Sequence, residues 1–197
     1  MSGNLLLFGS LVGLGVAALR SRRSRRTLPD VKEEDPAIVF LGGSCNPTTW
    51  RRDLLIPFLE ELGVSYYNPQ IDDWYPELIA IERKAKEDAK IHFFVVNKKT
   101  RGLASMIEVA ELVSRAFFQR AKNDVQVIVM IDDVPSDAHN IAGEDLTTAA
   151  IKDLNRARMY LREIVILHGG RLYSDMESAM TGLKELCTEL GYVSQKK

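Results

Sequence analysis

The sequence has 197 residues, of which 46% are hydrophobic and 27% are charged, and its net charge is -1. This size predicts one globular domain plus additional sequence, and the balanced charge excludes the overall basic excess typical of nucleic-acid-binding proteins. The two cysteines, Cys45 and Cys187, lack metal-ligand spacing, which argues against a zinc site or a disulfide framework and favours a reducing compartment.

The N-terminal segment combines an apolar run with a basic flank. No charged residue occurs from Leu5 to Leu19, and the next seven residues, RSRRSRR, contain five arginines. As a helix the apolar run would be about 22 Å long, which is short against the bilayer core of about 30 Å. Secretory signals carry their basic residues before the apolar run, and transit peptides spread them along the helix. The arrangement here therefore favours a retained membrane anchor.

We predict an anchor helix at residues 4–20, a basic stretch and linker at 21–36, and a globular domain at 37–193. The basic flank predicts a single-pass membrane protein whose globular domain faces the cytosol. A short anchor of this kind suits the mitochondrial outer membrane or the endoplasmic reticulum. The alternative is a buried amphipathic or mitochondrial targeting segment.

The remainder of the chain alternates between strand and helix patterns. Apolar, β-branched runs predict strands at 37–43, 64–70, 91–97 and 125–131, with a short fifth at 171–173. Helix patterns follow each strand, at 50–63, 76–90, about 103–117, about 147–168 and 175–191. The alternation predicts an α/β fold, a doubly wound, flavodoxin-like sheet of five parallel strands, preceded by the N-terminal hydrophobic helix.

Two of these helices have a predicted inner face. In the first, the inner residues are Leu54, Leu55, Phe58, Leu59 and Leu62, and Pro57 is expected to kink or break the helix. In the second, the inner residues are Leu78, Ile81, Ala85 and Ala89.

Two loops carry residue types that suit ligand binding. The loop GGSCNPTTW follows the first strand, and its glycines permit close backbone approach to a ligand, although it is not GxGxxG. The loop QIDDWYP places aromatic rings beside carboxylates, which suits a flat heterocycle such as a nucleobase. Both loops have a plain alternative, a simple turn in the first case and a capping loop with a packed Trp74 in the second.

Metal and cofactor chemistry have no support in the sequence. His92, His139 and His168 each lack a second histidine or cysteine at ligand spacing, and no GxSxG elbow follows a strand. We therefore expect no metal and no cofactor, and carboxylates remain as the candidate catalytic groups.

Glu108 supports two interpretations. It lies early in the helix after the third strand, where ligands bind in α/β sheets, and it has no cation three or four residues away. A helical projection, however, puts Glu108 on a solvated strip with Glu111 and Arg115. The same projection predicts a buried face of Leu103, Met106, Ile107, Ala110, Val113 and Phe117.

A set of short motifs in a fixed order carries a family resemblance. These are VFLGGS, a following WR, NPQIDDW, the helix with Glu82, DAKIHFFVV and SMIEVAEL. In these motifs the chain resembles the nucleoside 2-deoxyribosyltransferase-like family from about residue 37 to 180. It is most similar to the divergent animal branch, whose members carry NPQ.

The resemblance implies an activity and a set of site residues. Glu108 would be the nucleophile that attacks the anomeric carbon of deoxyribose and expels the base, as a carboxylate does in retaining glycosidases. Gly42, Gly43 and Ser44 would border the sugar. The base would be contacted from the acidic-aromatic region, whose candidates are Asp72, Asp73, Trp74 and Glu82.

The resemblance also implies partners. The substrate would be a nucleoside or nucleotide, with no nucleic acid involved. Active sites in the family form between subunits, so we expect a homo-oligomer in which Asn155 and Arg158 contribute from the long helix.

One position departs from the family pattern. Characterised transferases carry an acidic residue six positions before the nucleophile, and that position is Gly102 here, beside Arg101. Two functions are therefore predicted: a membrane-anchored enzyme acting on an N-glycosidic bond, or a catalytically silent membrane-tethered scaffold or nucleotide-binding module with the same fold.

Overall fold

The computed structural model describes residues 36–71, 75–121 and 124–194, which belong to one compact unit. The predicted anchor at 4–20, most of the linker and the candidate residues Asp72, Asp73 and Trp74 lie outside the described residues. Among the residues that are described, no helix has both the length and the apolar character needed to cross a membrane.

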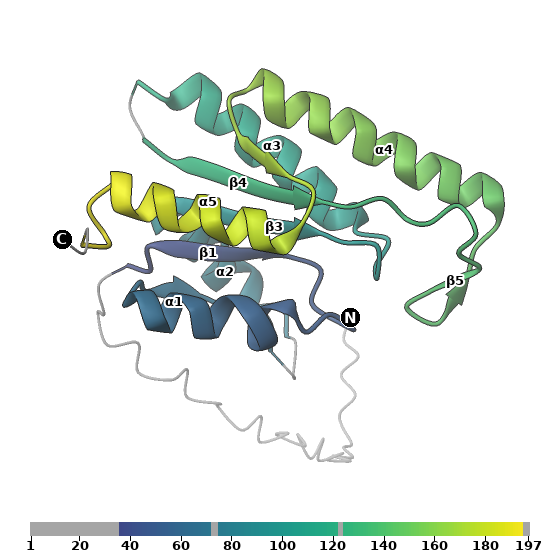
Figure 1. Ribbon diagram of the computed structural model, residues 1–197, viewed down its shortest axis with the longest axis horizontal. Helices are drawn as coiled ribbons and strands as arrows, with labels where there is room; N and C mark the ends of the chain where they lie inside the picture. The colour runs from purple at the N-terminus through teal and green to yellow at the C-terminus, as the bar shows by residue number, and fades with distance from the viewer. Residues whose placement is uncertain (1–35, 72–74, 122–123, 195–197) are drawn as a thin grey trace, which may run out of the picture. The chain divides into compact units, whose positions relative to one another are not determined.

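A five-stranded parallel sheet forms the centre of the fold (Figure 1). Its strands are β1 (Val39–Gly43), β2 (Tyr66–Tyr67), β3 (Ile91–Val96), β4 (Gln126–Ile131) and β7 (Arg171–Tyr173). They are arranged in the order β2-β1-β3-β4-β7, with every neighbouring pair parallel. This is the flavodoxin-like order, so the predicted fold class is confirmed for the described part of the chain.

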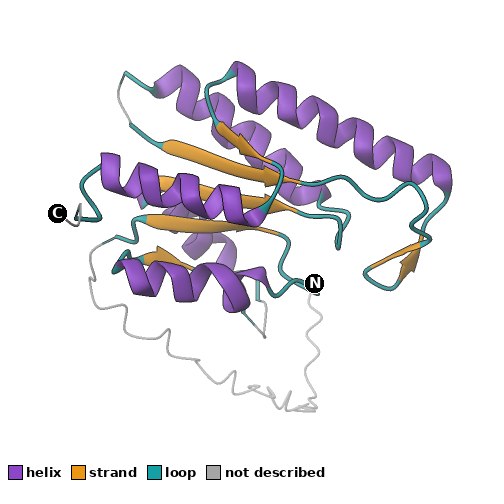
Figure 2. Cartoon of the chain, in the orientation of Figure 1, coloured by secondary structure: helices purple, strands orange, loops and turns teal. Residues whose placement is uncertain are grey.

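Helices cover both faces of the sheet (Figure 2). Helices α1 (Ile56–Leu62) and α5 (Met176–Glu189) pack on one face, against a core that includes Leu41 and Phe93. Helices α3 (Leu103–Gln119) and α4 (Thr148–Leu167) pack on the other, where α2 (Leu78–Asp88) also lies. All six residues of β3 are buried, as expected for a central strand covered on both faces.

Pro57 breaks the first helix as predicted. A π-helical turn at Arg51–Leu55 precedes α1, since Pro57 has no N–H to donate to the preceding turn. The turn changes which residues face the core. Leu55 and Leu59 are fully buried, whereas Leu54, predicted to be inward, is exposed.

The predicted inner faces of α2 and α3 also need correction. On α2, Ala85 packs toward the core but Ile81 is exposed. On α3, the buried residues are Ser105, Met106, Val109, Leu112 and Val113, while Leu103 and Ile107 are exposed. The buried stripe therefore includes a small serine that lets the helix approach the sheet, and it runs beside Glu108 instead of opposite to it.

A short hairpin occupies part of the predicted loop after β4. It consists of β5 (Asn140–Ile141) and β6 (Glu144–Asp145), joined by Ala142 and Gly143. Both connecting residues have positive φ, 56° and 86°, as a type I′ turn requires. The strands are too short for hydrophobic alternation to reveal them.

Candidate active site

The loops that follow β1 and β3 meet at the carboxyl ends of these two strands, where the strand order of the sheet reverses. In α/β folds this switch point is where ligands bind. The Thr100 hydroxyl donates to the Ser44 hydroxyl oxygen at 3.0 Å, so the two loops are joined side chain to side chain. The loops therefore form a connected rim next to β1 and β3.

Arg51 holds the loop after β1 from the inside. Its side chain is fully buried and donates to the carbonyl oxygens of Leu41, Gly43 and Ser44, at 3.0, 2.7 and 3.1 Å. The guanidinium carbon also lies 4.3 Å from the centre of the Trp50 ring. A rigid fork of donors suits three fixed carbonyls, so Arg51 fixes the conformation of this loop.

Arg158 of α4 does the same for the loop after β3. It is fully buried, and its Nη2 donates to the carbonyl oxygens of Asn97, Thr100 and Arg101, the shortest contact being 2.9 Å to Thr100. Both rim loops are thus anchored by a buried guanidinium.

Gln70, from the NPQ motif, connects the loop after β2 to the same rim. Its side-chain amide donates to the carbonyl oxygens of Cys45 and Thr48, each at 3.2 Å. The NPQ sequence therefore has a structural use here, because Gln70 ties the loop after β2 to the loop after β1.

Glu108 is held at this edge by a lysine from α2. Lys86 Nζ lies 2.6 Å from Glu108 Oε1 and 2.9 Å from Glu82 Oε1. The side chain of Lys86 is 16% exposed, against 38% for Glu108 and 30% for Glu82. Lys86 Nζ also lies 5.3 Å from the centre of the Phe40 ring. One ammonium thus joins two half-buried carboxylates.

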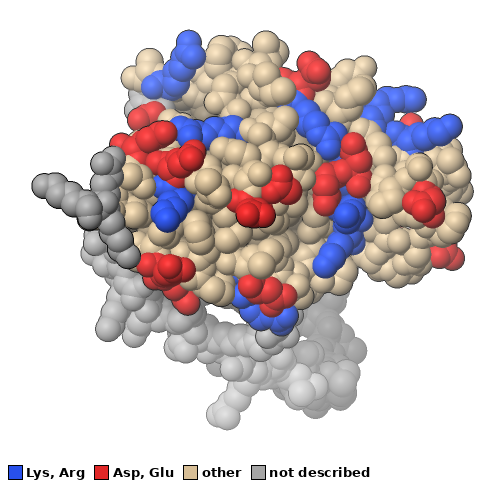
Figure 3. Space-filling model, viewed as in Figure 1, with Lys and Arg blue, Asp and Glu red and all other residues tan. Residues whose placement is uncertain are grey.

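The electrostatics follow from this grouping. Burial lowers the pKa of Lys86, but the hydrogen bonds that Lys86 donates to Glu108 and Glu82 outweigh this effect, so its pKa lies above the usual value and it is charged at neutral pH. Burial lowers the pKa of Arg51 to about 10. The pKa of the Cys45 thiol is raised, chiefly by burial, so this cysteine is a protonated thiol at neutral pH and a poor nucleophile. Figure 3 shows acidic and basic side chains interspersed over the face drawn there.

This arrangement suits attack on a carbon that develops positive charge. Lys86 fixes one oxygen of Glu108, and Oε2 has no hydrogen-bond partner among the described residues. A carboxylate with one fixed and one open oxygen is suited to trap an oxocarbenium-like centre. No group of three or more potential metal ligands occurs in the part of the chain that the structure describes.

A comparison with family models matches the part of the chain that contains this group. A family model described as nucleoside 2-deoxyribosyltransferase like matches residues 36–133, from just before β1 to the end of β4. This region belongs to that family. The match includes Glu82, Lys86 and Glu108, so the whole carboxylate–lysine group lies within the family domain.

The comparisons with curated proteins and with solved structures say less about this chain. No curated protein matches the sequence. Among the solved structures that match is that of the TIR domains of the activated Roq1 resistosome directly recognizing the pathogen effector XopQ. It shares 14% identity, with 76% of this chain and 98% of that chain covered and a TM-score of 0.42.

Several of the residues suggested by the family resemblance lie together. Glu108 and Glu82 share Lys86, and Ser44 belongs to the connected rim. Gly42 and Gly43 have a packing reason to be glycine. A Cβ on Gly42 would lie 2.2 Å from the Phe94 ring, and one on Gly43 would lie 2.4 Å from a backbone oxygen of β3.

Other predicted residues are used differently. The Asn155 side chain forms two hydrogen bonds with the backbone of Val134, at 2.9 and 2.8 Å. Both ends of its amide are thus occupied within its own chain. Gly102, at the position where family transferases carry an acid, adopts a left-handed conformation with φ 68° immediately before α3. Arg101 beside it pairs with Glu144 at 2.8 Å.

Sequence reasoning missed Lys86 and Arg51 as site components. It predicted that Arg158 contributes to a site between subunits, whereas Arg158 is buried and bonds to the loop after β3 of its own chain. The i,i+4 spacing of Glu82 and Lys86 was available as a signal. The contact from Lys86 to Glu108 spans 22 residues, and the two clamps depend on how loops fold back over the sheet. A pattern among neighbouring residues does not indicate contacts between residues so far apart in the sequence.

Proposed function

We propose that the domain cleaves or transfers at the N-glycosidic bond of a deoxynucleoside or deoxynucleotide, with Glu108 as the nucleophile. The observation that carries the proposal is the half-buried Glu108 carboxylate at the switch-point edge, with one oxygen bonded to Lys86. Membership of residues 36–133 in the nucleoside 2-deoxyribosyltransferase-like family supports the choice of substrate class.

The proposed reaction has two displacements. A Glu108 oxygen forms a bond to the anomeric carbon as the carbon–nitrogen bond breaks, and the bonding electron pair leaves with the base, which takes a proton from water. Water, or the nitrogen of a second base, then attacks the same carbon and releases the carboxylate. Throughout, Lys86 would hold the nucleophile in position and balance its charge.

The test measures free base released from deoxynucleosides and their 5′-monophosphates. We expect Glu108→Gln to reduce the rate at least about a thousandfold, or about 4 kcal/mol in barrier, because an amide cannot form the glycosyl-enzyme. Glu111→Gln is the matched control, since Glu111 is exposed on the same helix and makes only a 3.4 Å pair with Arg115. Equal release by wild type and Glu108→Gln would exclude this mechanism.

A catalytically silent scaffold or nucleotide-binding module is the second candidate. The observation that favours it is the same 2.6 Å contact, because an ammonium bonded to Glu108 occupies the oxygen that faces it. Gly102, in place of the family's acidic residue, points the same way.

Thermal stability separates the two candidates. A bound nucleotide stabilises the fold by about 2.7 kcal/mol at one hundred times its Kd, whether or not turnover occurs. Stabilisation without base release would support a binding module. The absence of both stabilisation and base release would support a scaffold. A rise in base release in Lys86→Met would mean that Lys86 restrains the nucleophile.

We further propose that residues 4–20 tether the domain to a membrane, with the domain on the cytosolic side. Support comes from the uncharged run Leu5–Leu19 and the five arginines that follow it. The full chain should stay with membranes in alkaline carbonate, and a chain lacking residues 1–26 should not. Protease added outside sealed mitochondria or microsomes should digest the domain; protection would reverse the proposed orientation.

We also propose that the domain forms a homo-oligomer. Large apolar side chains are exposed on α3 and α4, including Ile107 at 72% and Leu167 at 73%. Contiguous exposed apolar patches mark subunit interfaces, and we propose that these residues contribute to one. Light scattering should give a mass above one chain, and Ile107→Gln should lower it, whereas Leu54→Gln on the other face of the sheet should not.

A further inference from the structure

Three large apolar side chains are exposed at the ends of α3 and α4. Phe118 lies in the last turn of α3 and is 76% exposed, and Ile166 and Leu167 end α4 with 64% and 73% exposed. The two helix ends are in contact, because the centre of the His168 ring lies 5.1 Å from that of Phe117 and 5.8 Å from that of Phe118. Phe118, Ile166 and Leu167 together form an apolar end of the domain. Exposed apolar side chains grouped in this way mark a contact surface.

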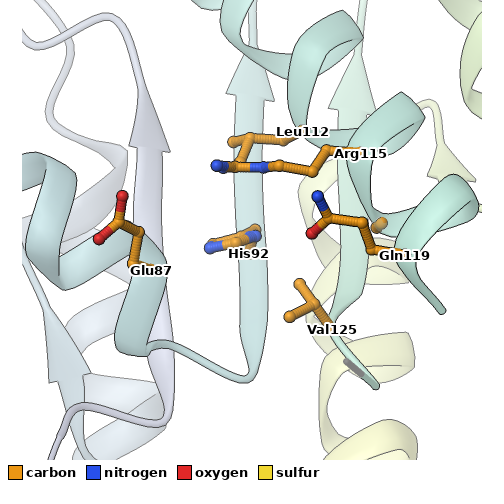
Figure 4. A pocket seen from close by; sticks show the side chains of 7 residues that line it. Glu87, His92, Leu112, Arg115, Gln119 and Val125 are labelled. Atoms are coloured by element: carbon orange, nitrogen blue, oxygen red, sulfur yellow. The ribbon is translucent and has the colours of Figure 1, made fainter. Parts of the chain in front are cut away.

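Cavities flank the last turns of α3. One of about 190 Å³ lies between α2 and α3, where Arg115 and Gln119 line its α3 side (Figure 4). Another, also of about 190 Å³, lies between the ends of α3 and α4 and is lined by Phe117 and His168. The end of α3 is thus incompletely packed on both sides, and Phe118 has little cover from the described residues.

The apolar end lies at the edge of the sheet where the strands begin. Strand β4 starts seven residues after α3 ends, and β7 starts four residues after α4 ends. All neighbouring strands are parallel, so β1 begins at this edge too (Figure 1). Residue 36, the first that the structure describes, comes three residues before β1. The segment that precedes the domain therefore joins it at the edge that carries the apolar end.

We propose that the apolar end rests on the lipid surface of the membrane to which residues 4–20 tether the domain. The inference rests on the proposed tether. The predicted linker, residues 21–36, spans at most about 55 Å at about 3.5 Å per residue. Tethering makes docking onto the membrane an intramolecular step, so that even a weak apolar contact is populated at the effective concentration that the linker sets.

The side chains around the apolar end fit a lipid surface. Arg120 is exposed, and its guanidinium carbon lies 4.8 Å from the centre of the Phe117 ring. An arginine stem can lie along apolar surface while its charge stays among the headgroups. Asp124 lines the same cavity as Arg120, so the local charges balance. The apolar side chains would therefore carry the contact, and binding should not require anionic lipid.

Contact at this edge would leave the other proposed surfaces free. The rim loops and Glu108 lie toward the opposite edge, where the strands end, and would face away from the membrane. Ile107 lies eleven residues before Phe118 on α3, about 16 Å along the helix. A contact between chains centred on Ile107 could therefore form at the same time.

The experiment reconstitutes the full chain in phosphatidylcholine vesicles whose acyl chains carry bromine, which quenches tryptophan fluorescence at short range. Phe118→Trp places a reporter at the apolar end, at an exposed position that does not contribute to the core. Leu103→Trp is the matched control, since Leu103 is 50% exposed at the other end of the same helix, about 22 Å away. We expect bromine to quench the reporter of Phe118→Trp beyond the background of Trp50 and Trp74 in wild type, and that of Leu103→Trp to show only the background.

A second change tests whether the side chains of the apolar end act together. Added to Phe118→Trp, Ile166→Gln should lower the ratio of docked to undocked domain about tenfold, because it removes one isoleucine side chain from an apolar environment. Ile107→Gln is the control and should leave the quenching unchanged. Equal quenching with and without Ile166→Gln would contradict the proposed contact.

Flotation of the vesicles separates this inference from the tether on which it rests. A chain that does not float with the vesicles would overturn both the tether and the contact. A chain that floats while Phe118→Trp is quenched no more than Leu103→Trp would overturn the contact alone. Emission from Phe118→Trp that shifts to the blue with protein concentration, without bromine quenching, would assign the apolar end to a second copy of the chain and overturn the contact with lipid.

Discussion

Helices α2 and α5 lie on opposite faces of the sheet and are attached to it in different ways. Helix α5 buries five residues against the core, including Leu183 and Cys187. Helix α2 has no buried residue. Its main contacts with the rest of the fold are polar: the Lys86 side chain bonds to Glu108, and the Lys86 carbonyl bonds to His92.

The inward sides of the two helices therefore serve different purposes. The inward side of α5 is apolar and contributes stability through packing. The inward side of α2 carries Glu82 and Lys86, which form a polar group with Glu108 of α3.

The largest expected effect is on the packed helix. Leu183→Ala should lower the free energy of unfolding by about 2–5 kcal/mol, because Leu183 is fully buried and the change leaves a cavity. Urea denaturation measures the effect, and the exposed Lys184→Ala on the same helix serves as control. A loss below about 1 kcal/mol would mean that the α5 face is less tightly packed than the structure indicates.

Acid should weaken the attachment of α2. Burial lowers the pKa of His92 to about 4, helped by the nearby charges of Arg115 and Lys86, although the Lys86 carbonyl opposes the shift. The unfolded chain, with a histidine pKa of about 6.5, takes up the proton first as pH falls. Stability is therefore complete above about pH 6.5 and is lost down to about pH 4, by roughly 3 kcal/mol in total.

Urea denaturation at several pH values between these limits measures the loss. In His92→Gln the amide can still reach the Lys86 carbonyl but does not titrate, so this part of the pH dependence should disappear. An unchanged pH dependence in the variant would assign the acid sensitivity to other groups.

A smaller effect is expected from the lysine that links α2 to α3. Lys86→Met should lower the free energy of unfolding by about 1 kcal/mol, because two carboxylates lose a shared partner in a partly exposed setting. Hydrogen exchange of α2 amides should become faster. Lys84→Met is the matched control, since Lys84 makes a 2.7 Å pair with Asp88 on the exposed side of α2. Equal effects of the two changes would contradict a special role for Lys86.

The smallest effect should come from the apolar residues of α2. Ile79 is half exposed, so Ile79→Ala should change the free energy of unfolding by no more than about 0.5 kcal/mol. A loss above about 1.5 kcal/mol in urea denaturation would mean that α2 is packed against something in solution, and the contrast with α5 would fail.

The strand pattern was sufficient to predict the sheet. Runs such as IHFFVV are apolar on both faces, which only a covered parallel strand requires, and the alternation with helices then sets the topology. Helix faces were harder to predict. On α3 the periodicity allowed two adjacent buried stripes, and packing against the sheet selected the one with Ser105 and Val109 over the one with Leu103 and Ile107.

The candidate site was only partly predictable. Glu108 and Glu82 follow from the family motifs, but the group that joins them comes from long-range contacts. Lys86 has the ordinary i,i+4 spacing from Glu82 of a surface pair, and only the fold brings α2 beside α3. Arg51 was assigned no role from the sequence, and its burial depends on the loop after β1 folding over it.

The two arginine clamps determine which polar groups the rim loops present. In a trans peptide the C=O and the following N–H point in opposite directions. The carbonyls of Gly43, Ser44, Thr100 and Arg101 point inward to a guanidinium. The amides that follow, those of Ser44, Cys45, Arg101 and Gly102, therefore point away from the clamps. Amides that point away from the clamps can donate to a ligand oxygen at the rim, so the assay should include nucleoside monophosphates beside the nucleosides.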